Sequence, residues 1–260
     1  MSWDDYFADE REAAAAEERG KKRTITVGWT VRTPKSSVIW SPPQPFRRQE
    51  SKPSSAKSVQ VCPAAIDFDH RHFVIPCPFD LTLQFARRPT GELTLVDADG
   101  EGSALRQTVL RELMVLHPPN EWRDPNKPLL QMIAPYVFVA DDPCYVVQSP
   151  PYLQYFPTPR PGVQIGGRYP VHVWPRPLSW GFEWHDVNAP LTFKRGEPWF
   201  YVHFETENPS ARVRLVEQEM TPELDEYLTS ILDVSNYVNK TYSLFADAKR
   251  MRPEKLVKPK

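Results

Sequence analysis

The sequence predicts a mainly β protein, with an antiparallel β-sandwich or jelly-roll-like core, an N-terminal helix and a C-terminal helical hairpin or tail. The 260 residues include 29 prolines, and proline belongs in turns, sheet edges and extended connections because it breaks helix interiors and central strands. Short aromatic and aliphatic runs between Pro and Gly residues fill the middle of the chain, as in sandwiches and jelly rolls. We therefore expect a helical extension at 1–24, a β domain at 25–220, and helices with a basic tail at 221–260.

The N-terminal extension has a helical pattern over residues 2–19. Ser2 followed by Asp5 resembles a capping box, and Gly20 suits the position after the last turn. A helix with so few apolar residues is marginal in isolation and needs a partner surface. Three aromatic residues at helical spacing are the expected partner-binding residues: Trp3, Tyr6 and Phe7.

The first half of the β domain contains fewer strand patterns than the second half. Residues 25–31 predict the first strand, residues 72–88 predict one or two strands, and residues 91–102 predict a partner strand and a turn. Residues 104–116 fit either a helix or a long strand.

After Leu129 the pattern is that of strands at short intervals. The segment FKRGEP (193–198) predicts a tight turn between two of them. The apolar runs are MIAPYVFVA, CYVVQS, YLQYF, RYPVHVW, LSWGFEW, LTF, WFYVHFE and RVRLVEQ.

The C-terminal region gives the clearest helix pattern. Thr221 is a good N-cap and Pro222 suits the first helical position, so we predict a helix over 221–232. A second helix follows at 236–250. The last residues, RPEKLVKPK, predict a flexible basic tail.

Charge and cysteine content narrow the class of protein. The formal net charge is −1, which argues against nucleic-acid binding, because that needs a cationic excess. Three widely spaced cysteines, an odd number, argue against a disulfide framework. Residues 129–140, the longest nearly apolar run, are too few to span a bilayer. We expect a cytosolic protein that binds neither nucleic acid nor membrane.

One group of residues could hold a metal. His70 and His72 would lie on one face of a strand, a geometry that β-barrel metal sites use. His185 is distant in the sequence but could lie nearby in space and supply a third ligand. A polar loop or strand edge is the favoured explanation of the pair, so the favoured expectation is no cofactor. The alternative is a cupin-like, metal-dependent enzyme of the non-haem oxygenase type, with Fe or Zn at His70, His72 and His185.

A stripe of aromatic residues could bind a small molecule. In LSWGFEW, Trp180 and Trp184 share one face of a predicted strand, and such rings stack on sugars or bases. Packing between two sheets is the competing interpretation. A sugar- or nucleotide-binding module is thus the second alternative.

Known catalytic patterns are missing from the sequence. There is no nucleophile elbow, no phosphate-binding Walker loop and no GxGxxG dinucleotide loop. We therefore interpret the chain as a non-enzymatic protein that works through protein–protein contacts.

The chain resembles an uncharacterised family of tailed-bacteriophage proteins of marine-phage type, from about residue 60 to residue 257. Five blocks carry the resemblance in the same order: VCPAAIDFDHRHFVIPCPFDLTL (61–83), APYVFVADDPCYVVQSPPYLQYF (134–156), VWPRPLSWGFEW (173–184), FKRGEPWFYVHFET (193–206) and SLFADAKRMRPEKLV (243–257). The resemblance implies no established activity and no site residues. It implies a protein that acts in the host cytoplasm or the virion. Together with the missing catalytic patterns, this setting favours a virion component or assembly accessory, with a second copy or other phage proteins as partners.

Overall fold

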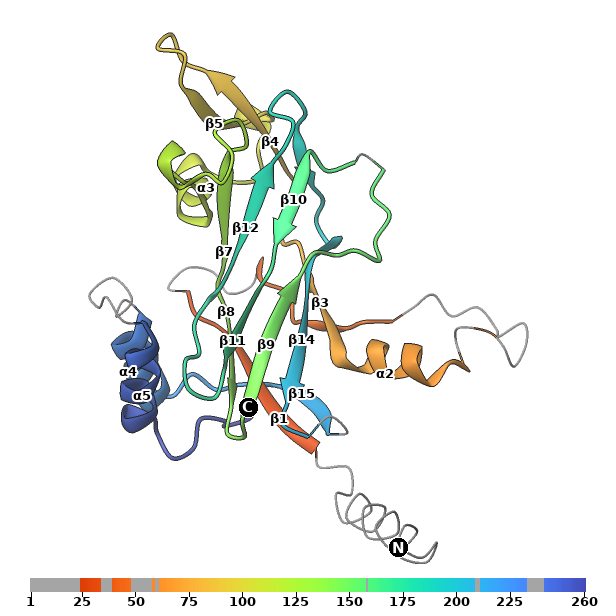
Figure 1. Ribbon diagram of the computed structural model, residues 1–260, viewed down its shortest axis with the longest axis vertical. Helices are drawn as coiled ribbons and strands as arrows, with labels where there is room; N and C mark the ends of the chain where they lie inside the picture. Colours follow the sequence, from red (N-terminus) through yellow and green to blue (C-terminus); the bar gives the residue numbers. More distant parts are fainter. Residues whose placement is uncertain are drawn as a thin grey trace, which may run out of the picture.

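The computed structural model describes residues 24–33, 39–47, 58, 61–157, 159–208, 211–232 and 241–260. The predicted N-terminal helix, with Trp3, Tyr6 and Phe7, lies outside the described residues. Within them the protein is mainly β, with several antiparallel sheets (Figure 1).

Among the described residues the strands form four small sheets, in which all neighbouring strands are antiparallel except β1 and β15. The three-stranded sheet β15-β1-β8 consists of Arg212–Glu217, Thr24–Val31 and Tyr136–Ala140. The four-stranded sheet β10-β12-β7-β6 consists of Gly162–Ile165, Leu178–Trp184, Leu129–Ala134 and Met114–Leu116. The five-stranded sheet β11-β9-β14-β3-β2 consists of Gly167–Pro170, Cys144–Ser149, Pro198–Thr206, His72–Pro76 and Gln44–Pro45. The sheet β13-β4-β5 consists of Leu191–Phe193, Leu81–Arg87 and Leu93–Asp97.

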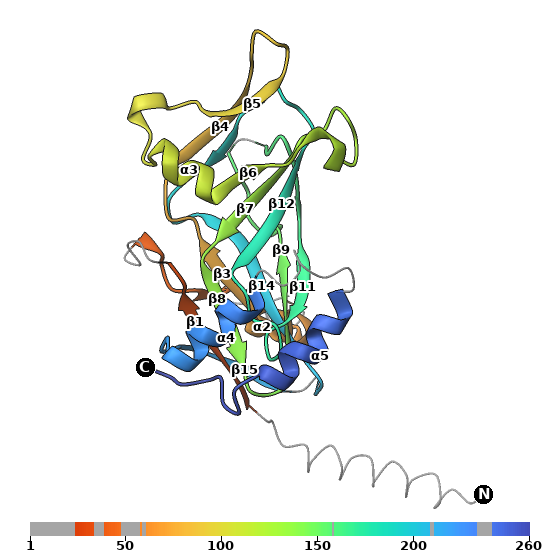
Figure 2. The same ribbon diagram turned by 90° about the vertical axis from the view of Figure 1, so that its left-hand side faces the viewer.

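Helices lie at the periphery of these sheets. The α-helices are α2 (Pro63–Arg71), α3 (Gln107–Leu113), α4 (Pro222–Leu232) and α5 (Thr241–Met251), and the 3-10 turns are η3 (Gly100–Gly102) and η4 (Pro119–Glu121). In the described part of the chain, no helix is both long and apolar enough to cross a membrane. In the lower half of Figure 1, α4 and α5 lie side by side at one side of the sheets β15-β1-β8 and β11-β9-β14-β3-β2, whereas α2 projects from the other side (Figures 1 and 2).

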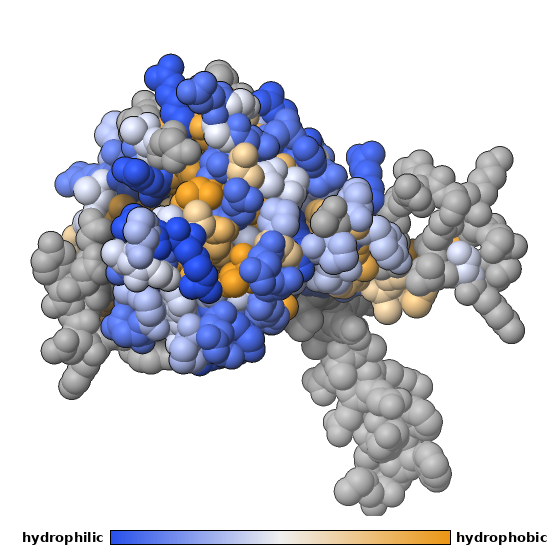
Figure 3. Space-filling view, turned by 90° about the horizontal axis from the view of Figure 1, so that it is seen from above, coloured by the Kyte–Doolittle hydropathy of each residue, from blue (hydrophilic) through white to orange (hydrophobic). Residues whose placement is uncertain are grey.

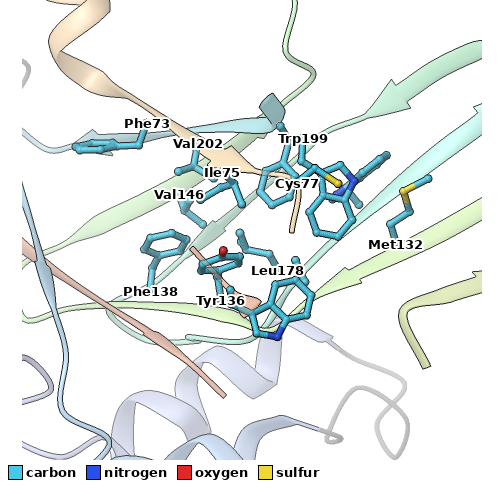
Figure 4. Packing of buried hydrophobic residues seen from close by; sticks show 14 of the residues in the cluster. Phe73, Ile75, Cys77, Met132, Tyr136, Phe138, Val146, Leu178, Trp199 and Val202 are labelled. Carbon is cyan, nitrogen blue, oxygen red and sulfur yellow. The ribbon is translucent and has the colours of Figure 1, made fainter. Parts of the chain in front are cut away.

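The core explains why the segment around β8 is apolar at every position. Tyr136, Phe138 and Ala140 face a cluster to which all four sheets contribute. Figure 4 shows Tyr136 and Phe138 opposite side chains of β3 and β14. The alternate residues Val137 and Val139 face a second cluster, formed with α4, α5 and the C-terminal segment. A strand that is buried on both faces has a continuous apolar sequence.

One end of the molecule has a mostly polar surface (Figure 3). Viewed from the end that carries β4 and β5, hydrophilic residues surround smaller hydrophobic areas (Figure 3). The three cysteines are free; Cys77 and Cys144 are buried and Cys62 is exposed.

The C-terminal residues 252–260 are not a flexible tail, so that prediction was wrong. The Arg252 Nε–H donates to the His172 carbonyl at 2.6 Å, and Asp141 Oδ1 accepts from the backbone N–H groups of Leu256 at 2.6 Å and Val257 at 3.3 Å. Leu256 and Val257 are buried in the second core cluster. Farther along, the buried Gln218 accepts from Lys258 N at 2.7 Å. The segment is therefore part of the folded domain.

Two other predicted elements differ from the structure. The run YLQYF forms turns and irregular backbone instead of a strand, because Pro150 and Pro151 supply no backbone N–H for a sheet ladder. Residues 104–116 divide between the two alternatives, with a helix at Gln107–Leu113 and a strand at Met114–Leu116.

Candidate binding surface

One face of the five-stranded sheet is turned away from the core and carries aromatic and titratable side chains. On β14, Phe200, Val202 and Phe204 belong to the core cluster. Because neighbouring side chains of a strand point to opposite faces, Tyr201 and His203 lie on the outer face. Three segments surround this face: α2, β2 with the residues that follow it, and the start of the β9–β10 connection.

Aromatic rings form a continuous group across this face. The Tyr201 ring lies 5.5 Å from the ring of Phe46 and 5.6 Å from that of Tyr152, measured between centroids. The Phe68 ring of α2 lies 6.2 Å from Tyr152 and stacks on His72 at 3.9 Å. Edge-to-face and stacked pairs at such distances stabilise one another. The rings therefore form a surface held in a defined arrangement.

Two depressions flank Tyr152. The larger, of about 940 Å³, lies between β2, the β9–β10 connection and the start of β14; its lining includes Phe46, Arg47 and Tyr201. The smaller, of about 640 Å³, lies over α2 and the end of β14; its lining includes His72 and His203. Tyr152 lines both depressions.

The histidines at the floor of the smaller depression are adjacent. The rings of His72 and His203 lie 4.7 Å apart. His72 Nδ1 is 2.7 Å from the Phe68 carbonyl, so Nδ1 carries the proton and Nε2 faces the Tyr152 hydroxyl at 3.5 Å. Nδ1 of His203 is buried and has no hydrogen-bond partner among the described residues.

Burial governs the charge of this pair. Desolvation lowers the pKa of His72, against the opposing effects of the Phe68 carbonyl and Asp69. Desolvation also lowers the pKa of His203, and the nearby His72 adds to this effect. Both imidazoles are therefore neutral at neutral pH, and the floor of the smaller depression is polar without a positive charge on either ring.

The rim of the surface is more exposed than its floor. Tyr155 is 96% exposed, Tyr152 52% and Leu153 42%. All three belong to the connection between β9 and β10, which runs at the right of Figure 1. Prolines 150, 151, 157, 159 and 161 bound this connection, and proline restricts the backbone to few conformations. The rim thus presents apolar contact area to solvent on a restrained backbone.

The predicted metal ligands do not lie together. His70 and His72 are not on one strand face, because α2 extends through Arg71 and only His72 begins β3. His70 is exposed on α2, whereas His185 follows β12, where its Nε2 contacts Glu183 Oε1 at 2.9 Å. No three His, Cys, Asp or Glu residues of the described ranges form a group that could hold a metal ion.

The predicted stacking residues belong to the core. Trp180 is 2% exposed and Trp184 0%. The Trp184 Nε1–H donates to the Asp186 carbonyl at 2.8 Å, and the Trp180 ring packs edge-on against Trp199 at 5.9 Å. Their shared face is turned inward between sheets, so neither ring offers a stacking surface to a ligand.

Sequence reasoning missed the residues that do reach solvent. Tyr152 and Tyr155 lie in a run predicted as a strand, and the helix of α2 was not expected. The flanking signals were present: Pro63 at the first helical position after Cys62, which favours a helix start, and the prolines on both sides of Tyr155.

No family model, curated protein or solved structure matches this chain.

Proposed function

We propose that this chain is a non-enzymatic protein that acts through protein–protein contacts, as a virion component or assembly accessory of a tailed phage. The observation that carries the proposal is the exposed rim of Tyr152, Leu153 and Tyr155 beside two depressions lined by aromatic rings. Its partner is a second copy or another phage protein, and it acts in the host cytoplasm or the virion.

The chemistry of the rim supports a protein partner. Tyrosine is enriched among the residues that dominate interface energies, because it buries a large ring and carries a hydroxyl that forms hydrogen bonds. A restrained loop loses little conformational freedom when it binds, which favours affinity. The prolines around Tyr152 and Tyr155 fit this requirement.

The resemblance to tailed-phage proteins supports the biological setting. It includes the segment APYVFVADDPCYVVQSPPYLQYF, which ends in the rim residues. Closed oligomers with self-complementary interfaces are common among proteins that assemble. The proposal therefore favours an assembly role over a soluble catalytic one.

Site-specific photo-crosslinking in infected cells tests this function. A photoreactive residue replaces Tyr155 in one variant and Ile165 in a matched control, because Ile165 is an exposed apolar residue on β10, 42% exposed like Leu153. We expect the Tyr155 position to form one major adduct, identified by mass spectrometry as this chain or another phage protein, and the Ile165 position to form none. Equal or diffuse adducts at the two positions would overturn the proposal.

Quantitative mass spectrometry of gradient-purified virions then separates the two settings. A fixed copy number per particle identifies a virion component. Presence in the infected-cell lysate alone identifies an assembly accessory.

A further inference from the structure

A second feature of the β9–β10 connection is the environment of Arg160. The guanidinium carbon lies 4.2 Å from the centroid of the Phe156 ring and 5.6 Å from that of Phe193. Such cation–π contacts hold a guanidinium in place through its faces. The ring contacts thus orient the planar guanidinium. Its N–H groups point outward in the plane of the group, where they can still donate hydrogen bonds.

Arg160 has no anionic partner in the described part of the protein. Its Nε is buried and makes no hydrogen bond there. Arginines 32, 71, 123, 168, 250 and 252, by contrast, all contact a carboxylate. A charge that is removed from water without a partner is costly, so buried charges are ordinarily paired.

Nearby groups do not neutralise the charge of Arg160. Desolvation lowers the pKa of Arg160 to about 10, and Cys77 and Glu197 oppose this shift only in part. Burial raises the pKa of the Cys77 thiol to about 12, so that neighbour is neutral at neutral pH. Glu197 lies close enough to act on Arg160 but forms no ion pair with it. Arg160 therefore remains charged and incompletely neutralised.

A small cavity of about 100 Å³ is lined in part by Arg160. Its lining combines the donors Arg160, Lys194 and Thr192, the carboxylate of Glu197, and apolar walls formed by Phe156 and prolines. Lys194 and Glu197 are placed by the turn between β13 and β14, where Gly196 has a φ of 82° that favours glycine. The Gly196 N–H donates to the Cys77 carbonyl and the Cys77 N–H to the Glu197 carbonyl, both at 2.8 Å, so the turn is anchored to the sheet.

We propose that Arg160 and Lys194 form a binding site for one small oxyanion group, a phosphate or a carboxylate. The guanidinium fork matches the two oxygens of such a group, the ammonium of Lys194 supplies a second positive charge, and the Thr192 hydroxyl supplies a further donor. Charge-assisted hydrogen bonds in a partly desolvated pocket are the strong ones. This inference does not depend on the protein partner proposed above, because the cavity shares no lining residue with the two depressions beside the aromatic rim.

Nuclear magnetic resonance of the arginine Nε–H groups in the full chain tests this site. Inorganic phosphate and acetate are titrated separately at constant ionic strength, with chloride as the reference anion. We expect a saturable shift of the Arg160 signal with at least one oxyanion, and the stronger of the two identifies the group that the cavity takes. Lys194→Gln should weaken binding about tenfold, the loss of one charge-assisted contact. The matched control Arg176→Gln removes an arginine that packs over Trp174 and should leave the affinity unchanged.

Glu197→Gln separates the proposal from its structural alternative. If Arg160 binds an external anion, removing the Glu197 carboxylate strengthens oxyanion binding, because this carboxylate and the oxyanion carry the same sign of charge and repel each other. If Arg160 instead stabilises the fold through its attraction to Glu197, this variant lowers the free energy of unfolding and does not strengthen oxyanion binding. Linear, unsaturated shifts that are equal for chloride, phosphate and acetate in the wild type would overturn the proposal without reference to any variant.

Discussion

Two proline-containing segments without regular secondary structure behave in opposite ways in this protein. Residues 252–260 lie along the domain and bury Leu256 and Val257. The β9–β10 connection instead exposes Tyr152 and Tyr155 to solvent. The first segment is rich in lysine and the second in aromatic residues, so composition alone would assign the two environments the other way round.

Polar side chains of the folded domain account for the difference. Asp141 and Gln218 accept backbone N–H groups of the C-terminal segment, and its own Arg252 donates to the carbonyls of His172 and Ala140. Such contacts substitute for a sheet ladder and allow the apolar residues between them to be buried. In the β9–β10 connection, the Tyr152 ring packs against Phe68 of α2 and Tyr201 of β14, whereas the Tyr155 side chain stays 96% exposed.

The largest effect is expected from breaking the anchor of the C-terminal segment. Arg252→Ala removes the donor to His172, Ala140 and Asp141 and leaves these carbonyl groups without that partner, in a place where the arginine side chain is only 16% exposed. We expect the free energy of unfolding to fall by about 3 kcal/mol, measured by urea denaturation. Lys255→Ala, an exposed position in the same segment, is the control. A loss below about 0.5 kcal/mol for Arg252→Ala would show that the anchor contributes little.

The sequence predicted those parts of the fold in which local signals and burial agree. The run at 25–31 forms β1, LSWGFEW forms β12, and the N-cap Thr221 with Pro222 begins α4. The Thr221 hydroxyl accepts from the Leu224 N–H at 3.2 Å, as its position in the sequence indicated. Where the pattern has one physical explanation, the prediction and the structure coincide.

The candidate binding surface could not be predicted from the sequence because it depends on long-range contacts. His72 and His203 are adjacent only because β3 and β14 pair in this register. The Trp180 and Trp184 stripe was recognised, but its direction depends on which face of β12 meets the other sheets. Alternation gives two faces and does not say which of them is covered.

An intermediate effect on stability is expected from the histidine pair, which lies at the base of the exposed rim. The pKa values of His72 and His203 are lowered by burial in the folded protein from 6.5. Below that pH the unfolded chain binds more protons than the folded one, so stability falls as pH falls. His203→Phe removes one of these groups, together with a buried nitrogen that has no hydrogen-bond partner in the described ranges. We expect this variant to lose less stability than the wild type on acidification from about pH 7 to about pH 5, measured by urea denaturation at each pH. Parallel losses in the two proteins would contradict this account.

The smallest effect on stability, and the sharpest contrast with Arg252→Ala, is expected at the rim itself. Tyr155→Ser alters a side chain that is 96% exposed, and a surface substitution of this kind changes the free energy of unfolding by less than about 0.5 kcal/mol. Association with the protein captured by photo-crosslinking should nevertheless weaken about tenfold or more, because an exposed tyrosine that a partner buries contributes far more to binding than to folding. Thermal unfolding and a binding titration on the same sample measure both quantities. If stability falls as far as in Arg252→Ala, the β9–β10 connection is a structural element like the C-terminal segment. If only binding falls, the two segments divide folding and recognition between them.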